Sequence, residues 1–431
     1  MCNGNSKSSE KRADSFRVVV AHPAQQHSYQ LAKALSKNDW LFSYITTIYY
    51  KKERFLYRLL AVLLDKENIR RMQGRCAPAI EMKLRQFNEL LGLMFLFLGR
   101  VLRNKMLLGF AGWTLGKSFG RKVAGFVKAN NVDMLVCFDT YALSAFKRLQ
   151  YTDTIRILDM SSIPVSSICS LIDEQIYNGT SFRDSYKMTR SIYSDRIITD
   201  TQKEIKCADY FLVASSFTRS QLVYAGVDAG QVFIVPYGVD LVRYHPPHKT
   251  GKKHNKPITF LFVGRMTAVK GFHILLEALS KLQPGTFKCI LVGHPQNSEG
   301  LIAKSGPDIE YVGAVPNSEM PDIYRRADVL ISPSLYDGFG LSVLEAMASG
   351  LCIICSRNTG ASDLVSDGET GFVIDPGSVK ELYLQLCDAL KDRDRLSRMG
   401  QNARIVAENY SWETYNKSIG RVFQEIYQEC E

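Results

Sequence analysis

Two carboxylates, Asp337 and Glu345, flank a pair of glycines in a segment that could bind a phosphorylated ligand. The apolar run 329–332 before it predicts a buried parallel strand, and the residues after Gly340 predict a short helix. Gly338 and Gly340 let the backbone approach a ligand closely, and a helix N-terminus offers free N–H groups to an anion. The segment suits a ligand with phosphate in its middle and hydroxyl groups at both ends, which is the layout of a nucleotide sugar.

A second strand–loop–helix pattern places two cations in a similar position. The apolar run 258–263 leads into Gly264 and Arg265, and Lys270 stands just before a helix with apolar side chains on one face. Arg265 can donate two N–H bonds to phosphate oxygens, and Lys270 adds a charge at a helix start. Taken singly, each residue has a simpler interpretation: Asp337 as the cap of a tight turn, Arg265 in a surface salt bridge and Lys270 as a solvated loop lysine. Taken together, they favour anion binding.

These patterns resemble the retaining glycosyltransferases of the GT-B fold, in the large group called family 4. The likeness is dense from about residue 208 to 375 and thinner before it. It implies an α/β fold with two Rossmann-like, doubly wound parallel-sheet domains that face a cleft. The stretches that carry it are Gly264-Arg265-x4-Lys270-Gly271, Asp337-Gly-Phe-Gly-Leu-x3-Glu345, Val235-Pro-Tyr-Gly238-Val239-Asp240, Tyr311-Val-Gly313 and Ser366-Asp-Gly368-x2-Gly371-Phe372-Val373.

The resemblance implies a role for each matched residue. Arg265 and Lys270 would hold the donor diphosphate and stabilise the departing nucleotide. Glu345 would accept hydrogen bonds from the ribose hydroxyls. Asp337, where the family usually has Glu, would contact the donor sugar, and its shorter side chain leaves open which sugar is recognised. The rest of the donor pocket would be formed by Gly264, Gly338, Phe339, Gly340 and Leu341.

The reaction that the resemblance implies is sugar transfer with retention at the anomeric carbon. Positive charge would stabilise the leaving diphosphate, and the leaving phosphate would take the proton of the acceptor. Neither a bound metal nor a cofactor is expected, because the family works without them and no DxD-type cluster stands in a suitable place. A UDP- or GDP-sugar would be the substrate.

The first part of the chain should hold the acceptor. His27 precedes an expected helix, where the family has a histidine after two glycines; here His22 and Pro23 stand in place of the glycines. His27 would bond the acceptor or the donor sugar, or it is a helix-start histidine with a structural role, and both interpretations stay open. Asp159 and Ser161 are candidate acceptor contacts or, alternatively, turn and cap residues.

Apolar runs alternate with helical patterns along the chain, which predicts doubly wound parallel sheets. The segment 245–257 is rich in Pro, Gly and Lys and is expected to be a linker. The expected domains are 15–245 for the acceptor and 256–409 for the nucleotide sugar, with a C-terminal helix, 410–431, that packs back on the first. The expected strands are 17–21, 134–138, 155–158, 210–213, 232–235, 258–263, 289–292, 309–312, 329–332, 351–355 and 371–374.

Positive charge is concentrated at the start of the chain. The first 130 residues carry 23 Lys and Arg against 8 Asp and Glu, a net charge of +15, whereas the whole chain has +11. The apolar-rich stretch 90–130 has seven basic residues and no acidic one, which favours contact with an anionic membrane surface. The alternative is an ordinary core helix with a solvated basic face. Nucleic acid is not expected, because no recognition motif accompanies the charge.

The expected localisation is cytoplasmic and peripheral, at the inner face of a membrane. The start of the chain has no apolar signal-peptide core, and the scattered cysteines suit a reducing compartment. The expected function is transfer of a sugar from a nucleotide sugar to a glycan or polyprenyl-linked saccharide, in the synthesis of bacterial surface polysaccharides. The alternatives are a nucleotide-sugar epimerase of the same fold and a non-catalytic, membrane-associated partner protein.

Overall fold

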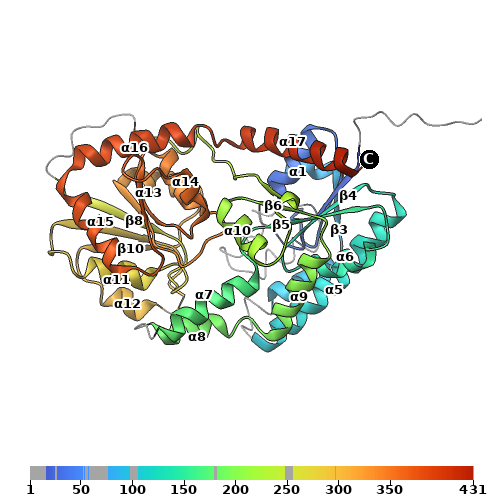
Figure 1. The fold of residues 1–431 in the computed structure, drawn as a ribbon, viewed down its shortest axis with the longest axis horizontal. Coiled ribbons are helices and arrows are strands. Elements are labelled where there is room, and N and C mark those ends of the chain that lie inside the picture. Colours follow the sequence, from blue (N-terminus) through green and yellow to red (C-terminus); the bar gives the residue numbers. More distant parts are fainter. Residues whose placement is uncertain are drawn as a thin grey trace, which may run out of the picture. The chain divides into compact units, whose positions relative to one another are not determined.

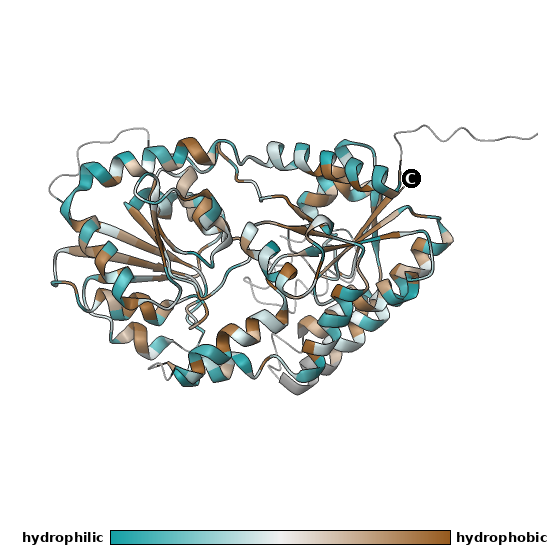
Figure 2. Cartoon of the chain, viewed as in Figure 1, coloured by the Kyte–Doolittle hydropathy of each residue, from teal (hydrophilic) through white to brown (hydrophobic). Residues whose placement is uncertain are grey.

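The computed structural model contains two parallel β-sheets, each with helices packed on it (Figure 1). It describes residues 16–24, 27–51, 53, 57, 76–97, 105–178, 182–247, 256–296 and 298–430. The expected linker 245–257 lies outside the described residues from 248 to 255. The strands are mainly apolar (Figure 2), as expected for parallel sheets that are covered on both faces.

The six-stranded sheet has the order β10-β9-β8-β11-β12-β13, and its strand pairs are parallel. All six strands were expected from the sequence, with bounds that differ by two residues or fewer. They are β8 (Ile258–Val263), β9 (Phe287–Val292), β10 (Ile309–Gly313), β11 (Val329–Ser332), β12 (Cys352–Ser356) and β13 (Gly371–Ile374).

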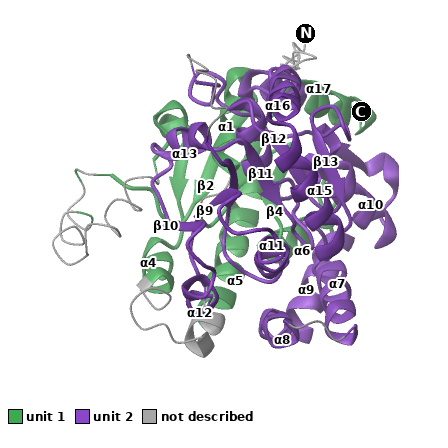
Figure 3. Ribbon diagram, turned by 90° about the vertical axis from the view of Figure 1, so that its left-hand side faces the viewer, with its two compact units in different colours: residues 1–158, 207–210, 419–431 green, residues 159–206, 211–418 purple. Residues whose placement is uncertain are grey.

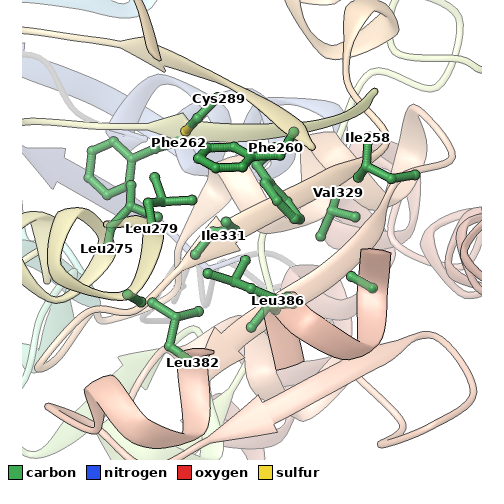
Figure 4. Packing of buried hydrophobic residues seen from close by; sticks show 14 of the residues in the cluster. Ile258, Phe260, Phe262, Leu275, Leu279, Cys289, Val329, Ile331, Leu382 and Leu386 are labelled. Atoms are coloured by element: carbon green, nitrogen blue, oxygen red, sulfur yellow. The ribbon is translucent and has the colours of Figure 1, made fainter. Parts of the chain in front are cut away.

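The core of this half lies between the six-stranded sheet and two helices, α11 (Phe272–Leu279) and α15 (Val379–Lys391). Leu275 and Leu279 of α11 are buried against the apolar side chains of the strands, and Leu382 and Leu386 of α15 join the same cluster (Figure 4). Burying each such side chain contributes about 1.5–3 kcal/mol. The packing holds the start of α11, and hence the loop before it, against β8.

The seven-stranded sheet has the order β3-β2-β1-β4-β5-β6-β7. Five of its strands were expected; β2 and β3 were not, because β2 is interrupted by a serine and β3 is only three residues long. The strands are β1 (Val18–Ala21), β2 (Leu41–Thr46), β3 (Leu84–Gln86), β4 (Met134–Phe138), β5 (Ile155–Met160), β6 (Tyr210–Val213) and β7 (Val232–Ile234). The fold class expected from the sequence, α/β with two doubly wound parallel sheets, is confirmed.

The chain divides into two compact units (Figure 3). Unit 1 comprises residues 1–158, 207–210 and 419–431, and unit 2 comprises 159–206 and 211–418. The boundaries 15–245 and 256–409 remain predictions. In unit 1, Tyr427 of the C-terminal helix stacks on Phe16 with 4.8 Å between the ring centres.

The remaining helices connect the strands or follow them. None of the helices in the described residues is both long enough and apolar enough to span a bilayer. Their bounds are α1 (Ser28–Lys37), α4 (Glu89–Phe97), α5 (Lys105–Ala129), α6 (Leu143–Leu149), α7 (Val165–Tyr177), α8 (Arg183–Arg190), α9 (Asp195–Lys206), α10 (Ser216–Tyr224), α12 (Glu299–Ala303), α13 (Met320–Arg326), α14 (Leu341–Ala348), α16 (Arg393–Ala407) and α17 (Trp412–Cys430).

Candidate active site

The strand order of the six-stranded sheet reverses between β8 and β11. The two strands are neighbours, with Val329 opposite Phe260 and Leu330 opposite Leu261. In an open parallel sheet, ligands bind beyond the carboxyl ends of the strands at such a reversal, because the two following loops diverge to opposite faces there. The loops that leave these two strands are the ones that carry the predicted cations and carboxylates.

Lys270 and Asp337 meet at this point. The Lys270 Nζ donates a hydrogen bond of 2.5 Å to Asp337 Oδ2, and about a quarter of each side chain is exposed. The backbone of Asp337 is held on both sides, since its N–H donates to the Asn358 carbonyl and its carbonyl accepts from Gly360. Lys270 is therefore not a solvated loop lysine, and Asp337 is not a helix cap: the cap position of α14 is Gly340.

Arg265 stands at the carboxyl end of β8, with Gly264 before it. Gly264 N–H donates to the Val292 carbonyl over 2.9 Å, and Met266 N–H donates to the His294 carbonyl over 3.0 Å, so backbone bonds to the neighbouring strand's end fix this loop. The Arg265 side chain is exposed, and no carboxylate of the described residues pairs with it. The salt-bridge interpretation of Arg265 finds no partner in that part of the chain.

Two glycines of the loop after β11 occupy places that no larger residue fits. A Cβ on Gly338 would lie 2.2 Å from the Ser161 carbonyl oxygen. Gly340 has a φ of +88° and a Cβ there would lie 2.8 Å from a methyl carbon of Thr359. Between them, Phe339 is buried edge-on against Tyr237, whereas Leu341 opens α14 and is partly exposed. The loop thus has one fixed path into the N-terminus of α14.

Glu345 lies one turn into α14 and is half-buried. Its Oε2 accepts a 2.8 Å hydrogen bond from the hydroxyl of Tyr324 on α13. Burial raises the pKa of Glu345, and hydrogen bonds from Tyr324 and Tyr244 together with the charge of Arg243 act against that rise. Neither tyrosine was expected from the sequence, because a tyrosine within an apolar pattern is indistinguishable from an ordinary core residue.

His27 belongs to unit 1 and not to the unit that holds the residues above. It precedes α1, makes no side-chain cap bond, and contacts the Phe138 ring edge-on at 5.2 Å between ring centres. His22 is buried beside Phe138 as well, and its Nδ1 accepts from Ala24 N–H. Both histidines follow β1 and contact the last residue of β4, and the seven-stranded sheet reverses its order between these two strands. His22 was seen in the sequence only as a departure from a motif.

Of the two other candidates, Asp159 is buried at the end of β5. Ser161 follows it, and its carbonyl packs directly on Gly338. No group of three His, Cys, Asp or Glu side chains in the described parts of the chain is arranged as a metal site.

Comparison with known proteins gives one family and one fold. Residues 247–406 match the family described as glycosyl transferases group 1. A D-inositol 3-phosphate glycosyltransferase of Nocardia farcinica is 30% identical over 239 residues, which cover 51% of this chain and 50% of the relative. The match thus spans about half the length of that curated relative.

Two solved structures are similar over nearly the whole chain. Sucrose-phosphate synthase from Thermosynechococcus elongatus has a TM-score of 0.67 at 18% identity and covers 96% of this chain and 100% of its own. Anabaena Alr3699/HepE in complex with UDP-glucose has a TM-score of 0.62 at 15% identity, with coverages of 95% and 99%. Residues 247–406 are thus similar to the glycosyl transferases group 1 family, and the two parallel α/β sheets of the chain have the GT-B fold.

Proposed function

We propose that this protein is a retaining glycosyltransferase, which moves a sugar from a nucleotide sugar to a glycan or polyprenyl-linked saccharide. The observation that carries the proposal is the Lys270–Asp337 pair at the strand reversal, on the two loops that hold Arg265 and lead into the N-terminus of α14. The family match supports the reaction class. The UDP-glucose complex of the similar Anabaena protein supports a UDP-sugar as the donor, with a GDP-sugar as the other choice.

The proposed chemistry is electrostatic. As the bond between the sugar and the diphosphate breaks, negative charge grows on the leaving phosphate, and fixed positive groups stabilise it. An ammonium group has three N–H donors, so Lys270 can bond a phosphate oxygen while it keeps Asp337. Asp337 would then fix the lysine and reach the sugar hydroxyls. Arg265 supplies a second, forked donor, and Glu345 accepts from the ribose.

The acceptor is assigned to the reversal point of the seven-stranded sheet, with His27 as the candidate that contacts it. A lipid-carried acceptor would place the protein at the inner face of a membrane, in bacterial surface polysaccharide synthesis. Support comes from α5, whose exposed face is basic around one aromatic residue, Trp113, while its opposite face is buried. The exposed basic residues are Lys117, Arg121, Lys122 and Lys128, and the buried apolar ones include Ala111, Leu115, Phe119, Val123 and Val127.

The direct test is a panel of UDP-, GDP- and ADP-sugars, incubated with the purified protein and a mixture of candidate acceptors, in which free nucleotide is measured. Release from one donor by the wild type, and its loss in Lys270→Ala, is the expected result. Conversion of a donor to an isomeric sugar without acceptor would favour the epimerase instead. No turnover and no donor binding would favour a non-catalytic partner protein.

A further inference from the structure

The carboxylate assigned to the ribose, Glu345, is held by two tyrosines from elements that are distant in the chain. Tyr324 comes from α13 and is completely buried; its hydroxyl donates to Glu345 Oε2 over 2.8 Å. Tyr244 follows the segment 235–240 and is nearly as buried. Its hydroxyl acts to lower the pKa of Glu345 and donates to Asn317 Oδ1 over 3.4 Å, and its ring meets that of Tyr324 edge-to-face at 5.7 Å between centres.

Tyr244 is itself fixed. The backbone of Tyr244 is bonded on both sides: its N–H donates to the Asp240 carbonyl over 2.8 Å, and its carbonyl accepts from Arg404 Nη1 over 2.7 Å. The same Arg404 Nη1 donates to the Ala348 carbonyl at the end of α14. Tyr244 and the helix that carries Glu345 are therefore tied to one guanidinium group.

A half-buried carboxylate loses solvation and is kept charged and oriented only if protein donors replace water. Burial raises the pKa of Tyr324 well above its ordinary value, so its hydroxyl stays a donor through the working range of pH. An ionised carboxylate has about four acceptor positions, so a donor on Oε2 leaves positions for a ligand. A rigid donor bonded to Oε2 thus fixes the orientation of the Glu345 carboxylate, and with it the direction from which a ligand can donate a hydrogen bond to the remaining acceptor positions.

We propose that Tyr324 is a positioning residue, which holds the carboxylate of Glu345 ready to accept hydrogen bonds from the ribose of the donor nucleotide, with Tyr244 as a second support. The proposal rests on the proposed function, since it needs a nucleotide in this site. It adds a residue that contacts no substrate and acts through Glu345.

The test is Tyr324→Phe, which keeps the buried ring and removes only the hydroxyl. UDP, GDP and ADP are titrated into the wild type and the variant by calorimetry, with inorganic pyrophosphate as a probe that has no ribose. The nucleotide that binds the wild type should bind Y324F about tenfold more weakly, the effect of one lost hydrogen bond to a charged group. Pyrophosphate should bind both equally. Tyr44→Phe is the matched control: Tyr44 is equally buried, its hydroxyl bonds Ser28, and it lies in unit 1.

Two further readouts separate positioning from a general structural effect. In the Glu345→Gln background, Y324F should cause little additional loss, because its effect passes through the carboxylate. The pH dependence of nucleotide affinity should also shift in Y324F. Without Tyr324 the pKa of Glu345 rises, so nucleotide affinity falls on acidification at a higher pH than in the wild type. The charged and titratable groups that act on Glu345 are Tyr324, Tyr244 and Arg243.

The outcomes are distinct. If the wild type binds none of the three nucleotides, the proposed function fails and this inference with it. If the wild type binds one and Y324F binds it equally well with the same pH profile, the inference alone fails. If Y324F weakens nucleotide and pyrophosphate binding alike, the hydroxyl has a structural role and the positioning role is refuted. The same holds if the substitution weakens nucleotide binding as much in the E345Q background as in the wild type.

Discussion

At the scale of single residues, the main finding is that two predicted site residues with different expected roles bond each other. Lys270 was expected on the diphosphate and Asp337 on the sugar, and the structure joins them by a 2.5 Å hydrogen bond. Asp is one methylene shorter than the Glu that the family usually carries, yet its backbone is held by Asn358 and Gly360, so the short side chain still reaches the ammonium group. The pair makes the sugar end and the phosphate end of the proposed site one unit.

The first prediction concerns Asp337→Ala. The variant should lower kcat about 10- to 100-fold, since it removes the proposed sugar contact and lets Lys270 move, both of which would matter most in the transition state. The affinity for free nucleoside diphosphate should change little, because that ligand has no sugar. Steady-state kinetics and calorimetry measure the two effects. An unchanged kcat would remove Asp337 from the site.

The second prediction concerns Gly338→Ala. The added Cβ would meet the Ser161 carbonyl oxygen at 2.2 Å, and a backbone atom cannot move away as a flexible side chain can. The loop must therefore shift, and activity should fall at least tenfold, as expected when reacting groups are misplaced. Gly300→Ala in α12 is the control, because its Cβ meets nothing within 4 Å. Equal activity of both variants would contradict the close packing.

At the scale of elements, the loop before α11 is fixed by what packs on it. Tyr186 of α8 lies in one apolar cluster with Ala268 and Val269 of that loop, and with Leu335 and Tyr336 of the loop after β11. His273, on the first turn of α11, is buried against the ring of Phe182, and its Nε2 lies 3.4 Å from the Tyr186 hydroxyl. The helical segment after β5 thus supports both loops of the candidate donor site.

The third prediction follows from His273. Burial lowers its pKa from 6.5 to about 4, so in the folded protein it stays neutral where the unfolded chain takes up a proton. The unfolded state then binds more protons between these two pKa values, and the free energy of unfolding falls as the pH drops from about 6.5 towards 4, by about 3 kcal/mol at most. His273→Gln cannot titrate. Its melting temperature should fall less than that of the wild type between about pH 7 and pH 5; an equal fall would assign the titration elsewhere.

Some strands and contacts of the structure can be predicted from the sequence, and others cannot. Strands such as β8 and β11 were predictable because covered parallel strands are continuous apolar runs. β3 has three residues and no such run, so nothing local marks it; it exists because it pairs with β2. The contact between Tyr324 and Glu345 was unpredictable for a related reason. It depends on how α13 and α14 pack, and no periodicity in the sequence states that.

At the scale of the whole molecule, both sheets repeat one plan, with a reversal between the first and fourth strand of each half. The residues at the two reversals differ in chemistry: cations and carboxylates follow β8 and β11, whereas His22 and His27 lie near the ends of β1 and β4. This difference agrees with the proposal that one half binds the donor and the other binds the acceptor. The strands and loops of the proposed donor half could be predicted because its motifs are local, whereas the roles of its site residues remain predictions; the proposed acceptor half has only weak local signals.

The fourth prediction concerns the uneven charge. Replacing three of the exposed basic residues of α5, as K117E/R121E/K128E, should abolish most binding to anionic vesicles in a sedimentation assay, because each cation near the surface contributes about 1 kcal/mol to the binding free energy. The control K288E/K304E/R398E makes the same charge change at exposed positions of unit 2 and should leave binding intact. Equal binding by both variants, or equal binding to neutral vesicles in high salt, would refute an electrostatic membrane contact.

The central claim is that Lys270 and its neighbours at the reversal of the six-stranded sheet bind the diphosphate of a nucleotide. The most direct measurement is calorimetric titration of UDP and GDP into the wild type, Lys270→Ala and the control Lys288→Ala. One nucleotide should bind the wild type and K288A alike and bind K270A at least tenfold more weakly, the effect of a lost charged contact. Binding to K270A with wild-type affinity, or no binding of either nucleotide to the wild type, would contradict the account.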